Sequence, residues 1–172
     1  TCVIRTIQAG VPIARIELLD ELQMEAVNRR AGLDYPTLPT LFLEFHGSEA
    51  GVVEQVEGVQ ELAADLGAHD LIWATAEEDR RRLWEARHAS YEASLALRPG
   101  CRSVTTDVCV PISRLAECIL ETRREIDEAG LVAPIIGHAG DGNFHVLFLV
   151  DPDDPKELEQ VEELNDRLVR RA

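Results

Sequence analysis

The chain has 172 residues, of which 45% are hydrophobic and 28% are charged. That length and composition are typical of one globular domain and exclude an intrinsically disordered chain. The 17 basic residues stand against 32 acidic ones, so the formal net charge is -15. A surface this acidic repels phosphate groups, which excludes nucleic acid as a partner and disfavours anionic membrane surfaces.

The cysteines and the hydrophobic runs predict a protein of a reducing compartment. Cys2, Cys101, Cys109 and Cys118 form no CxxC pair, and their spacing matches no zinc template. We expect free thiols, with Cys109 and Cys118 buried. No hydrophobic run approaches the ~20 residues of a membrane span, and no signal segment opens the chain. We therefore expect a cytoplasmic location, with peripheral contact at the inner membrane face left open.

Turn residues and hydrophobic periodicity divide the chain into alternating strands and helices. In chain order, the first half is expected to hold a β-like run at 2–7, a strand at 14–18, a helix at 19–31, a strand at 40–46, a helix from 49 to about 66 and a strand at 70–74. The second half is expected to hold a helix at 77–97, a strand at 103–110, a helix at 114–129, strands at 132–137 and 143–150, and a helix at 157–172. Ser48 and Ser113 are the expected N-caps of two of the helices.

This order predicts an α+β fold of the ferredoxin-like kind, with an antiparallel sheet and helices packed on one face. A parallel doubly wound sheet fits less well, because residues 132–150 have the pattern of a hairpin. No GxGxxG follows a strand and no GxxxxGK[ST] occurs, so the common nucleotide-binding motifs are missing. Because the chain begins with Thr1 inside the β-like run, we expect an incomplete domain of a larger protein.

The segment at 137–145, Gly-His-Ala-Gly-Asp-Gly-Asn-Phe-His, is the most informative stretch. A two-residue turn at Asp141 and Gly142 would pair His138 with His145 across the hairpin, with Cβ atoms about 5 Å apart and Asn143 on the same face. Two neutral imidazoles at that separation can share a divalent ion. Glycines in the motif would let a large group approach the backbone. The alternative is a surface hairpin with two incidental histidines.

Two further features bear on a binding site. A metal is usually held by three protein ligands, and Glu17 and Glu44 are the candidates for a third within the chain, although both also fit as ordinary strand residues. Arg87 lies in the expected helix 77–97, on one face with Trp84, Tyr91 and Leu95. Its guanidinium must extend into water, pair with an acid of the protein, or bind another anion such as a substrate carboxylate. His46 and His69 have no partner within sequence reach.

The motif at 137–145, together with the segments 14–20, 39–47, 83–88 and 106–115, resembles the C-terminal domain of FAD-linked 2-hydroxy acid dehydrogenases. Within that family the segments resemble the cytochrome-linked D-lactate dehydrogenase branch more than the glycolate oxidase or D-2-hydroxyglutarate branches. The resemblance implies that residues 1–172 form the substrate- and metal-binding cap domain, with FAD bound mainly by an N-terminal domain. It also implies that His138 and His145 bind zinc or manganese, that Asn143 positions the substrate, and that Arg87 grips the substrate carboxylate.

The same resemblance places a third metal ligand and a general-base histidine in a Glu-His-Gly segment downstream of this chain. No catalytic residue is therefore named within the chain, and the isolated fragment is expected to be flavin-free and inactive. The implied reaction is oxidation of a small D-2-hydroxy acid, D-lactate first, to the 2-oxo acid. A glycolate oxidase or D-2-hydroxyglutarate dehydrogenase subunit and a non-catalytic ferredoxin-like ligand-binding module are the alternatives. The electron acceptor and homo-oligomerisation are left open.

Overall fold

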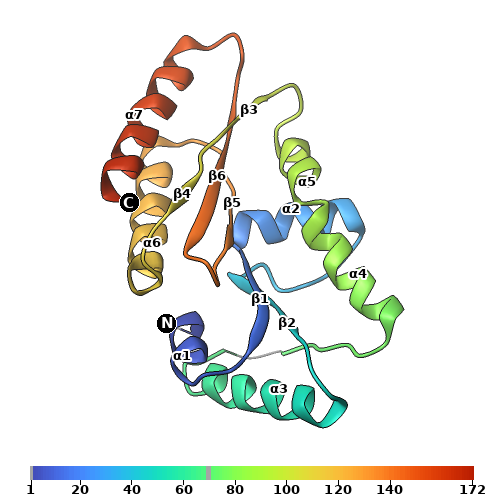
Figure 1. Cartoon of the computed structure of the whole chain (residues 1–172). Helices are drawn as coiled ribbons and strands as arrows, with labels where there is room; N and C mark the ends of the chain where they lie inside the picture. Colours follow the sequence, from blue (N-terminus) through green and yellow to red (C-terminus); the bar gives the residue numbers. More distant parts are fainter. Residues whose placement is uncertain (1, 69–70) are drawn as a thin grey trace.

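Residues 2–68 and 71–172 are described by the computed structural model of the chain (Figure 1). The helices in these residues are α1 (Cys2–Gln8), α2 (Glu21–Ala31), α3 (Glu49–Ala64), α4 (Glu77–His88), α5 (Ser90–Leu97), α6 (Ile112–Ala129) and α7 (Pro155–Arg171). The strands are β1 (Ile13–Leu19), β2 (Thr40–Phe45), β3 (Arg102–Thr105), β4 (Val108–Cys109), β5 (Ile135–His138) and β6 (Asn143–Val150). None of the helices in the described ranges has the length and apolar character that a membrane span requires.

The strands form one antiparallel sheet in the order β2-β1-β5-β6-β3, and β4 also pairs with β6. β6 is the longest strand and is buried from Val146 onward. Its run of Val, Leu and Phe is typical of a strand covered on both faces. The expected α+β class with an antiparallel sheet is confirmed.

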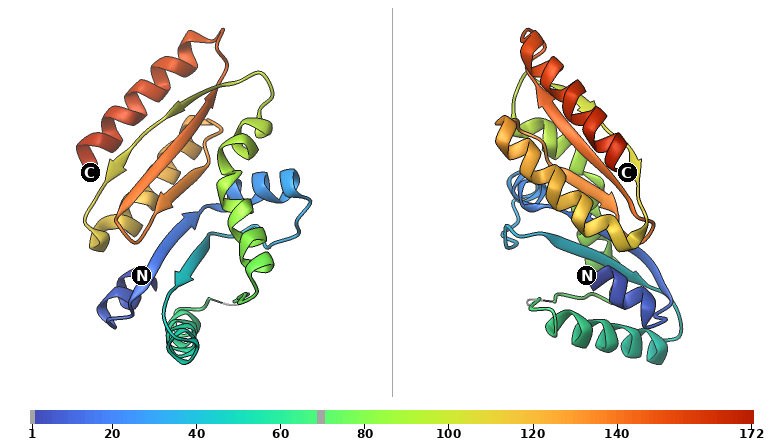
Figure 2. Two further views of the ribbon diagram at one scale, coloured as in Figure 1. Left: turned by 45° about the vertical axis from the view of Figure 1, so that its right-hand side comes forward. Right: turned by 90° about the vertical axis from the view of Figure 1, so that its left-hand side faces the viewer.

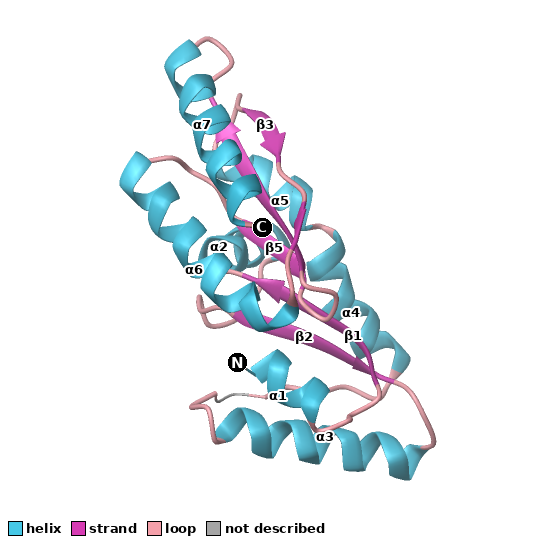
Figure 3. Ribbon diagram, turned by 60° about the vertical axis from the view of Figure 1, so that its left-hand side comes forward, coloured by secondary structure: helices cyan, strands magenta, loops and turns pink. Residues whose placement is uncertain are grey.

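Helices cover both faces of this sheet. One hydrophobic cluster joins Phe144 and Val146 of β6 to α6 and α7, which lie side by side in Figure 3. The two helices contribute residues spaced three or four apart, the pattern of an amphipathic helix, such as Leu115, Cys118, Thr122 and Ile126 of α6. α6 and α7 therefore form a helical layer on one face, but the helices are not confined to one face as expected, because α2, α4 and α5 cover the other.

A second and smaller cluster lies on the opposite face. It joins Leu19 of β1 to Met24 and Val27 of α2, Ala86 of α4 and Ala93 of α5. Leu19 and Ile16 belong to different clusters, as strand alternation requires for an odd and an even position. Figure 2 shows α2, α4 and α5 on the side of the sheet away from α6 and α7. The helix α4 brings Arg87 over this face.

Two helix boundaries follow from capping residues that the sequence shows. Asp20 begins α2 because its Oδ1 accepts a hydrogen bond from the Gln23 amide at 2.8 Å, and Gly32 ends it with φ of 61°. Ser48 caps α3 by accepting from the Gly51 amide at 3.2 Å. The expected cap at Ser113 is wrong: α6 already begins at Ile112, and the N-cap position is Pro111, which makes no side-chain cap.

Two expected strands are not strands. Residues 2–7 belong to helix α1, where Val3 and Thr6 are buried on one face and the Thr6 hydroxyl donates to the Cys2 carbonyl at 3.0 Å. Tertiary burial here overrides the β preference of β-branched side chains. Residues 71–74 of the expected strand 70–74 have no regular structure. Asp70 and His69 lie outside the described residues.

Two expected continuous elements are divided. The helix expected at 77–97 breaks at Ala89, whose ψ is 6°. The Ser90 hydroxyl donates to the Arg87 carbonyl at 2.6 Å, and the Ser90 carbonyl accepts from Gln23 at 3.1 Å, so side chains replace regular helix contacts there. The strand expected at 103–110 divides into β3 and β4 around Thr106, which accepts the Val146 amide hydrogen on its hydroxyl at 2.9 Å.

Candidate functional site

The β5–β6 hairpin brings the motif residues together in a register that differs from the expected one. His138 pairs with Asn143, and Ile136 pairs with His145. The turn spans residues 139–142, so the expected direct pairing of His138 with His145 is wrong. The slip amounts to two residues along β6. Because strand side chains alternate with a period of two, His138, Asn143 and His145 still project from one face.

The two imidazole rings lie close together on that face. Their centroids are 5.6 Å apart and their planes meet at 86°. The His138 side chain is 46% exposed and the His145 side chain 23% exposed, so a small ligand can reach both from solvent. The rings therefore meet as diagonal neighbours across the hairpin. Their binding of a metal stays a prediction.

On each ring, Nδ1 has an oxygen partner within the protein. Nδ1 of His138 lies 2.9 Å from Oε1 of Glu17 on β1. Nδ1 of His145 lies 3.2 Å from the Thr106 carbonyl oxygen and 3.4 Å from Oδ1 of Asp107. A carbonyl oxygen and a carboxylate can only accept, so both Nδ1 atoms donate. The nitrogens left for another ligand are the two Nε2 atoms.

Arg87 pairs with an acid of the protein. Its Nη2 and Nε donate to Oε2 of Glu17 at 2.8 and 3.2 Å, and the two side chains are 13% and 6% exposed. Of the outcomes that the sequence left open, the structure shows the internal ion pair. The expected face shared with Tyr91 is wrong, because the break at Ala89 places Tyr91 in α5, where it is exposed. Whether Arg87 also contacts a substrate stays a prediction.

Asn143 is anchored by the segment between β3 and β4. Its Nδ2 donates to Oδ1 of Asp107 at 2.7 Å and to the Val108 carbonyl at 3.1 Å. The amide oxygen of Asn143 is then the group left for a ligand. Two further residues were not predicted for the site: Thr106, which contacts His145, and Asp107, which contacts both His145 and Asn143. The signal that could have indicated them is the segment 106–115, which is among those that resemble the family.

Neither of the two glutamates completes a metal site. Glu17 contacts the Nδ1 side of His138, away from the nitrogen left for a ligand. Glu44 on β2 instead binds Arg15 at 3.4 Å and His46 at 3.0 Å. Within residues 2–68 and 71–172 no group of three or more His, Cys, Asp or Glu side chains could hold a metal ion. The described part of the chain therefore brings together two imidazoles as candidate ligands.

The glycines of the motif serve the packing of the protein itself. A Cβ at Gly142, whose φ is 75°, would lie 2.1 Å from the Val110 carbonyl oxygen. A Cβ at Gly137 would lie 2.8 Å from the Asn143 carbonyl oxygen. At these two positions the expected space for an approaching ligand is therefore filled by the protein.

A buried carboxylate fixes the strand that carries His138. Oδ2 of Asp20 accepts from the Ile135 amide at 2.9 Å and from Nη1 of Arg123 at 3.2 Å, so Asp20 links α2, β5 and α6. Burial raises the pKa of Asp20 to about 6, against the effect of the Gln23 amide and of Arg123. The sequence predicts a helix beginning beside Asp20, but nothing in it indicates the link to β5.

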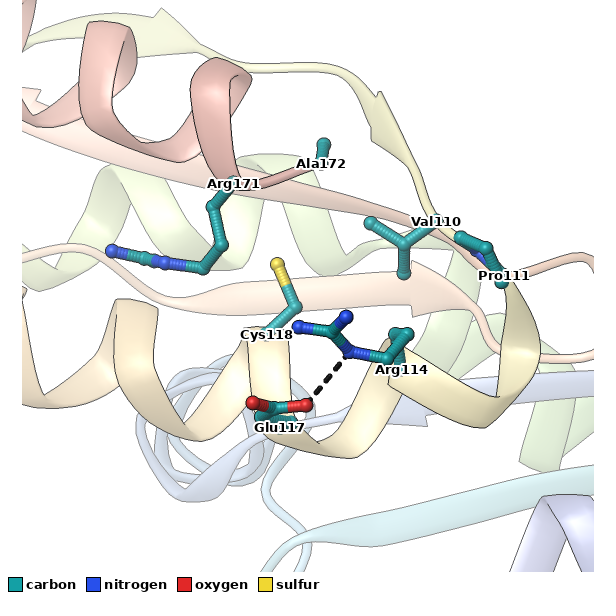
Figure 4. A pocket seen from close by; sticks show the side chains of 7 residues that line it. All are labelled: Val110, Pro111, Arg114, Glu117, Cys118, Arg171 and Ala172. Carbon is teal, nitrogen blue, oxygen red and sulfur yellow. Dashed lines mark hydrogen bonds and ion pairs between the residues drawn. The ribbon is translucent and has the colours of Figure 1, made fainter.

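A pocket between α6 and α7 lies apart from the histidine pair. It has a volume of about 140 Å³ and is lined by Val110, Pro111, Arg114, Glu117, Cys118, Arg171 and Ala172 (Figure 4). Burial raises the pKa of the Cys118 thiol, which disfavours the thiolate that binds metals or attacks electrophiles. Cys118 is buried as expected, whereas Cys109 is exposed; all four cysteines are free thiols.

Comparison with known proteins identifies the family. The model of the family described as FAD linked oxidases, C-terminal domain, matches residues 1–172. The chain belongs to this family. The predicted resemblance to the C-terminal domain of FAD-linked dehydrogenases is thereby confirmed.

Relatives of this FAD-linked oxidase domain carry lactate dehydrogenase names. A protein of Danio rerio named Probable D-lactate dehydrogenase, mitochondrial, is 51% identical over 98% of this chain and 34% of its own length. The D-lactate dehydrogenase [cytochrome], mitochondrial, of Arabidopsis thaliana is 39% identical over 98% of this chain and 30% of its own length. The chain thus spans about a third of the length of these relatives.

Solved structures share the fold at low sequence identity. An alkyldihydroxyacetonephosphate synthase matches 98% of this chain and 36% of its own chain with a TM-score of 0.64 and 12% identity. A p-cresol methylhydroxylase matches 98% of this chain and 40% of its own with a TM-score of 0.60 and 14% identity. The arrangement of strands and helices is therefore shared with a part of each of these two longer chains.

Proposed function

We propose that this chain is the substrate- and metal-binding part of an FAD-dependent dehydrogenase that oxidises a D-2-hydroxy acid, D-lactate first, to the 2-oxo acid. The observation that carries the proposal is the pair of imidazole rings, 5.6 Å apart, beside the amide of Asn143 on one sheet face. The family match and the D-lactate dehydrogenase names of two relatives support the substrate class. We further propose that residues 1–172 act as the cap domain of the longer enzyme.

The donor set of the histidine pair fits a divalent ion. Each ring donates through Nδ1, so each Nε2 carries the lone pair that zinc or manganese binds. His138 and His145 would hold the ion, and a third ligand from a Glu-His-Gly segment stays a prediction. The ion would supply Lewis acidity that lowers the pKa of a substrate hydroxyl.

The family name implies FAD, but the described residues include no comparable group that we can assign to it. No GxGxxG follows a strand in residues 2–68 or 71–172. We therefore assign no FAD contact to this chain and derive no step through the flavin. FAD itself stays the proposed redox cofactor of the longer protein.

The residues of this chain would bind and orient the hydroxy acid. Arg87 donates the hydrogen of Nε and one of Nη2 to Glu17, so Nη1 and the second hydrogen of Nη2 are the donors left for a substrate carboxylate. The amide oxygen of Asn143 can accept the hydrogen bond of the substrate hydroxyl, because Asp107 and Val108 already hold its amide nitrogen. Two fixed contacts at the carboxylate and the hydroxyl restrain the α-carbon between them.

The test is a substrate and metal profile of the longer enzyme. We expect kcat/KM to be highest for D-lactate among D-lactate, glycolate and D-2-hydroxyglutarate. Chelation should lower the rate, and zinc or manganese should restore it. His145→Ala should lower kcat/KM at least about 100-fold, because removing a ligand costs more than disturbing its surroundings. Val169→Ala, at an exposed apolar residue of α7, is the control and should leave kcat/KM unchanged.

The same panel separates the other functions. The glycolate oxidase subunit GlcD of Escherichia coli is 28% identical over 93% of this chain and 32% of its own length, which makes glycolate the second candidate substrate. If the enzyme oxidises none of the three acids, the proposal is contradicted and a non-catalytic ligand-binding module is favoured. A cytoplasmic location stays a prediction, and the names of the two relatives above include the word mitochondrial.

A further inference from the structure

The Glu17 side chain contacts two of the predicted site residues, His138 and Arg87. Its Oε1 lies 2.9 Å from Nδ1 of His138, and its Oε2 accepts two hydrogen bonds from Arg87. Glu17 is 5% exposed, so both contacts are made in a protein environment rather than in water. A single buried carboxylate thus connects the predicted metal ligand on β5 with the predicted carboxylate-binding arginine on α4.

We propose that Glu17 is a positioning residue that holds His138 in the Nδ1–H tautomer and so presents Nε2 of that ring to the divalent ion. The inference rests on the proposed function for the identity of the ligand. This role differs from that of a third metal ligand, for which Glu17 is a candidate from the sequence alone.

The hydrogen-bonding chemistry of the three groups supports this assignment. Because Arg87 donates to Oε2, the Glu17 side chain acts as a carboxylate, and its Oε1 has only lone pairs to offer. Nδ1 of a neutral His138 must therefore carry the hydrogen. A histidine that binds a metal through one nitrogen commonly donates the other N–H to a carboxylate or carbonyl, which fixes the ring and raises its basicity.

The second histidine has the same arrangement with a different acceptor. Nδ1 of His145 lies 3.2 Å from the backbone carbonyl oxygen of Thr106, and a carbonyl oxygen can only accept. Both rings therefore present Nε2, although unrelated segments of the chain supply the acceptors. With the same tautomer fixed by two independent contacts, both rings can bind one ion through Nε2.

The chain contains a matched control on the neighbouring strand. Glu44 of β2 also contacts one arginine and one histidine, Arg15 at 3.4 Å and His46 at 3.0 Å. That contact uses Nε2 of His46, so it favours the opposite tautomer. The Glu44 and His46 side chains are 26% and 69% exposed. Glu44→Gln removes the same charge as Glu17→Gln without touching His138 or His145.

The experiment measures histidine tautomers and zinc affinity in the same protein. Long-range 1H–15N spectra of the 15N-histidine-labelled, metal-free chain, at a pH where the rings are neutral, report which nitrogen carries hydrogen. We expect Nδ1–H at His138 and His145 in the wild type. Glu17→Gln should populate Nε2–H at His138, leave His145 unchanged, and weaken Zn²⁺ binding about 10- to 100-fold. Glu44→Gln should leave both tautomers and the Zn²⁺ affinity unchanged.

Several outcomes would overturn the inference. One is an Nε2–H tautomer at His138 in the wild type, which needs no variant and so does not depend on Glu17→Gln being folded. Another is an unchanged tautomer and Zn²⁺ affinity in Glu17→Gln, and a third is equal weakening by Glu44→Gln. If the wild-type tautomers are as expected but Zn²⁺ and Mn²⁺ do not bind, the metal part of the proposed function fails while the role of Glu17 in setting the tautomer stands.

Discussion

Two sets of side chains next to strand β1, one toward β5 and one toward β2, each consist of a glutamate, an arginine and a histidine, but they lie in different surroundings. Toward β5, Glu17 joins Arg87 and His138, with the glutamate and arginine side chains 6% and 13% exposed. Toward β2, Glu44 joins Arg15 and His46, with exposures of 26%, 47% and 69%. The two sets have the same residue types, so residue type alone does not decide which of them can form a binding site.

Burial and connection to other elements make the difference. The Glu17 set links β1, α4 and the β5–β6 hairpin, and Asp20 at the end of β1 also binds the Ile135 amide of β5. The ion pairs of the Glu44 set join β1 to the outer strand and the residue that follows it, and Arg15 also lies 4.6 Å from the ring centre of Trp84 on α4. Charges removed from water interact more strongly and are costlier to leave unpaired. We therefore expect changes on the β5 side to have larger effects than matched changes elsewhere.

The largest effect is expected in the hairpin turn on the β5 side. Gly142→Ala places a side chain on a left-handed residue and against the Val110 carbonyl oxygen at 2.1 Å. We expect the free energy of unfolding to fall by about 3–5 kcal/mol. Gly140→Ala, two residues away, meets only Ile16 at 3.6 Å and should stay within about 0.5 kcal/mol. Urea unfolding of both variants measures this, and equal effects would contradict tight packing of the turn.

The two glutamates test the comparison directly. Glu17→Ala leaves Arg87 buried without its acid, so we expect a loss of about 3 kcal/mol in the free energy of unfolding. Glu44→Ala leaves exposed partners in contact with water and should cost less than about 1 kcal/mol. The measurement is urea unfolding at neutral pH. Similar losses in the two variants would show that burial does not distinguish the two sides of β1.

The smallest predicted effect is a dependence of stability on pH through Asp20. Its pKa is raised by burial from 3.8 to about 6 in the folded chain, so the folded state binds the proton more tightly than the unfolded state. The stabilisation is therefore present at low pH and is lost as the pH rises through about 6. Between pH 5 and pH 7 this carboxyl should lower the free energy of unfolding by about 1 kcal/mol.

Asp20→Asn isolates that contribution. Asparagine can still cap α2, but it has no titratable carboxyl, so the decrease between pH 5 and pH 7 should be smaller by about 1 kcal/mol. This window lies above the range in which Glu157 contributes, since its pKa is lowered by Arg98 and its stabilisation is lost only as the pH falls below about 4.5. The same pH dependence in wild type and variant would contradict the raised pKa of Asp20.

Local chemistry made much of the fold predictable. The αL glycine at Gly32, the cap at Ser48 and the proline at the start of α7 mark helix ends through their own backbone requirements. The alternation and β-forming residues of β1, β2 and β6 likewise indicate strands without knowledge of their neighbours. Predicted elements were wrong where residues far apart in the sequence compete for the same backbone group. The Gln23 side chain, for example, donates to the Ser90 carbonyl next to the helix break at Ala89.

The sequence by itself determined that a glycine-rich hairpin carries two histidines and an asparagine on one sheet face, because side-chain alternation survives a register slip of two residues. Tertiary structure alone decided the register, the pairing of Arg87 with Glu17 across 70 residues and the contact of Glu17 with His138 across 121. The physical reason is the distance along the sequence over which each kind of interaction acts. Backbone preferences act between residues near in sequence, whereas a buried charge is matched by whatever partner the packed sheet and helices bring to it.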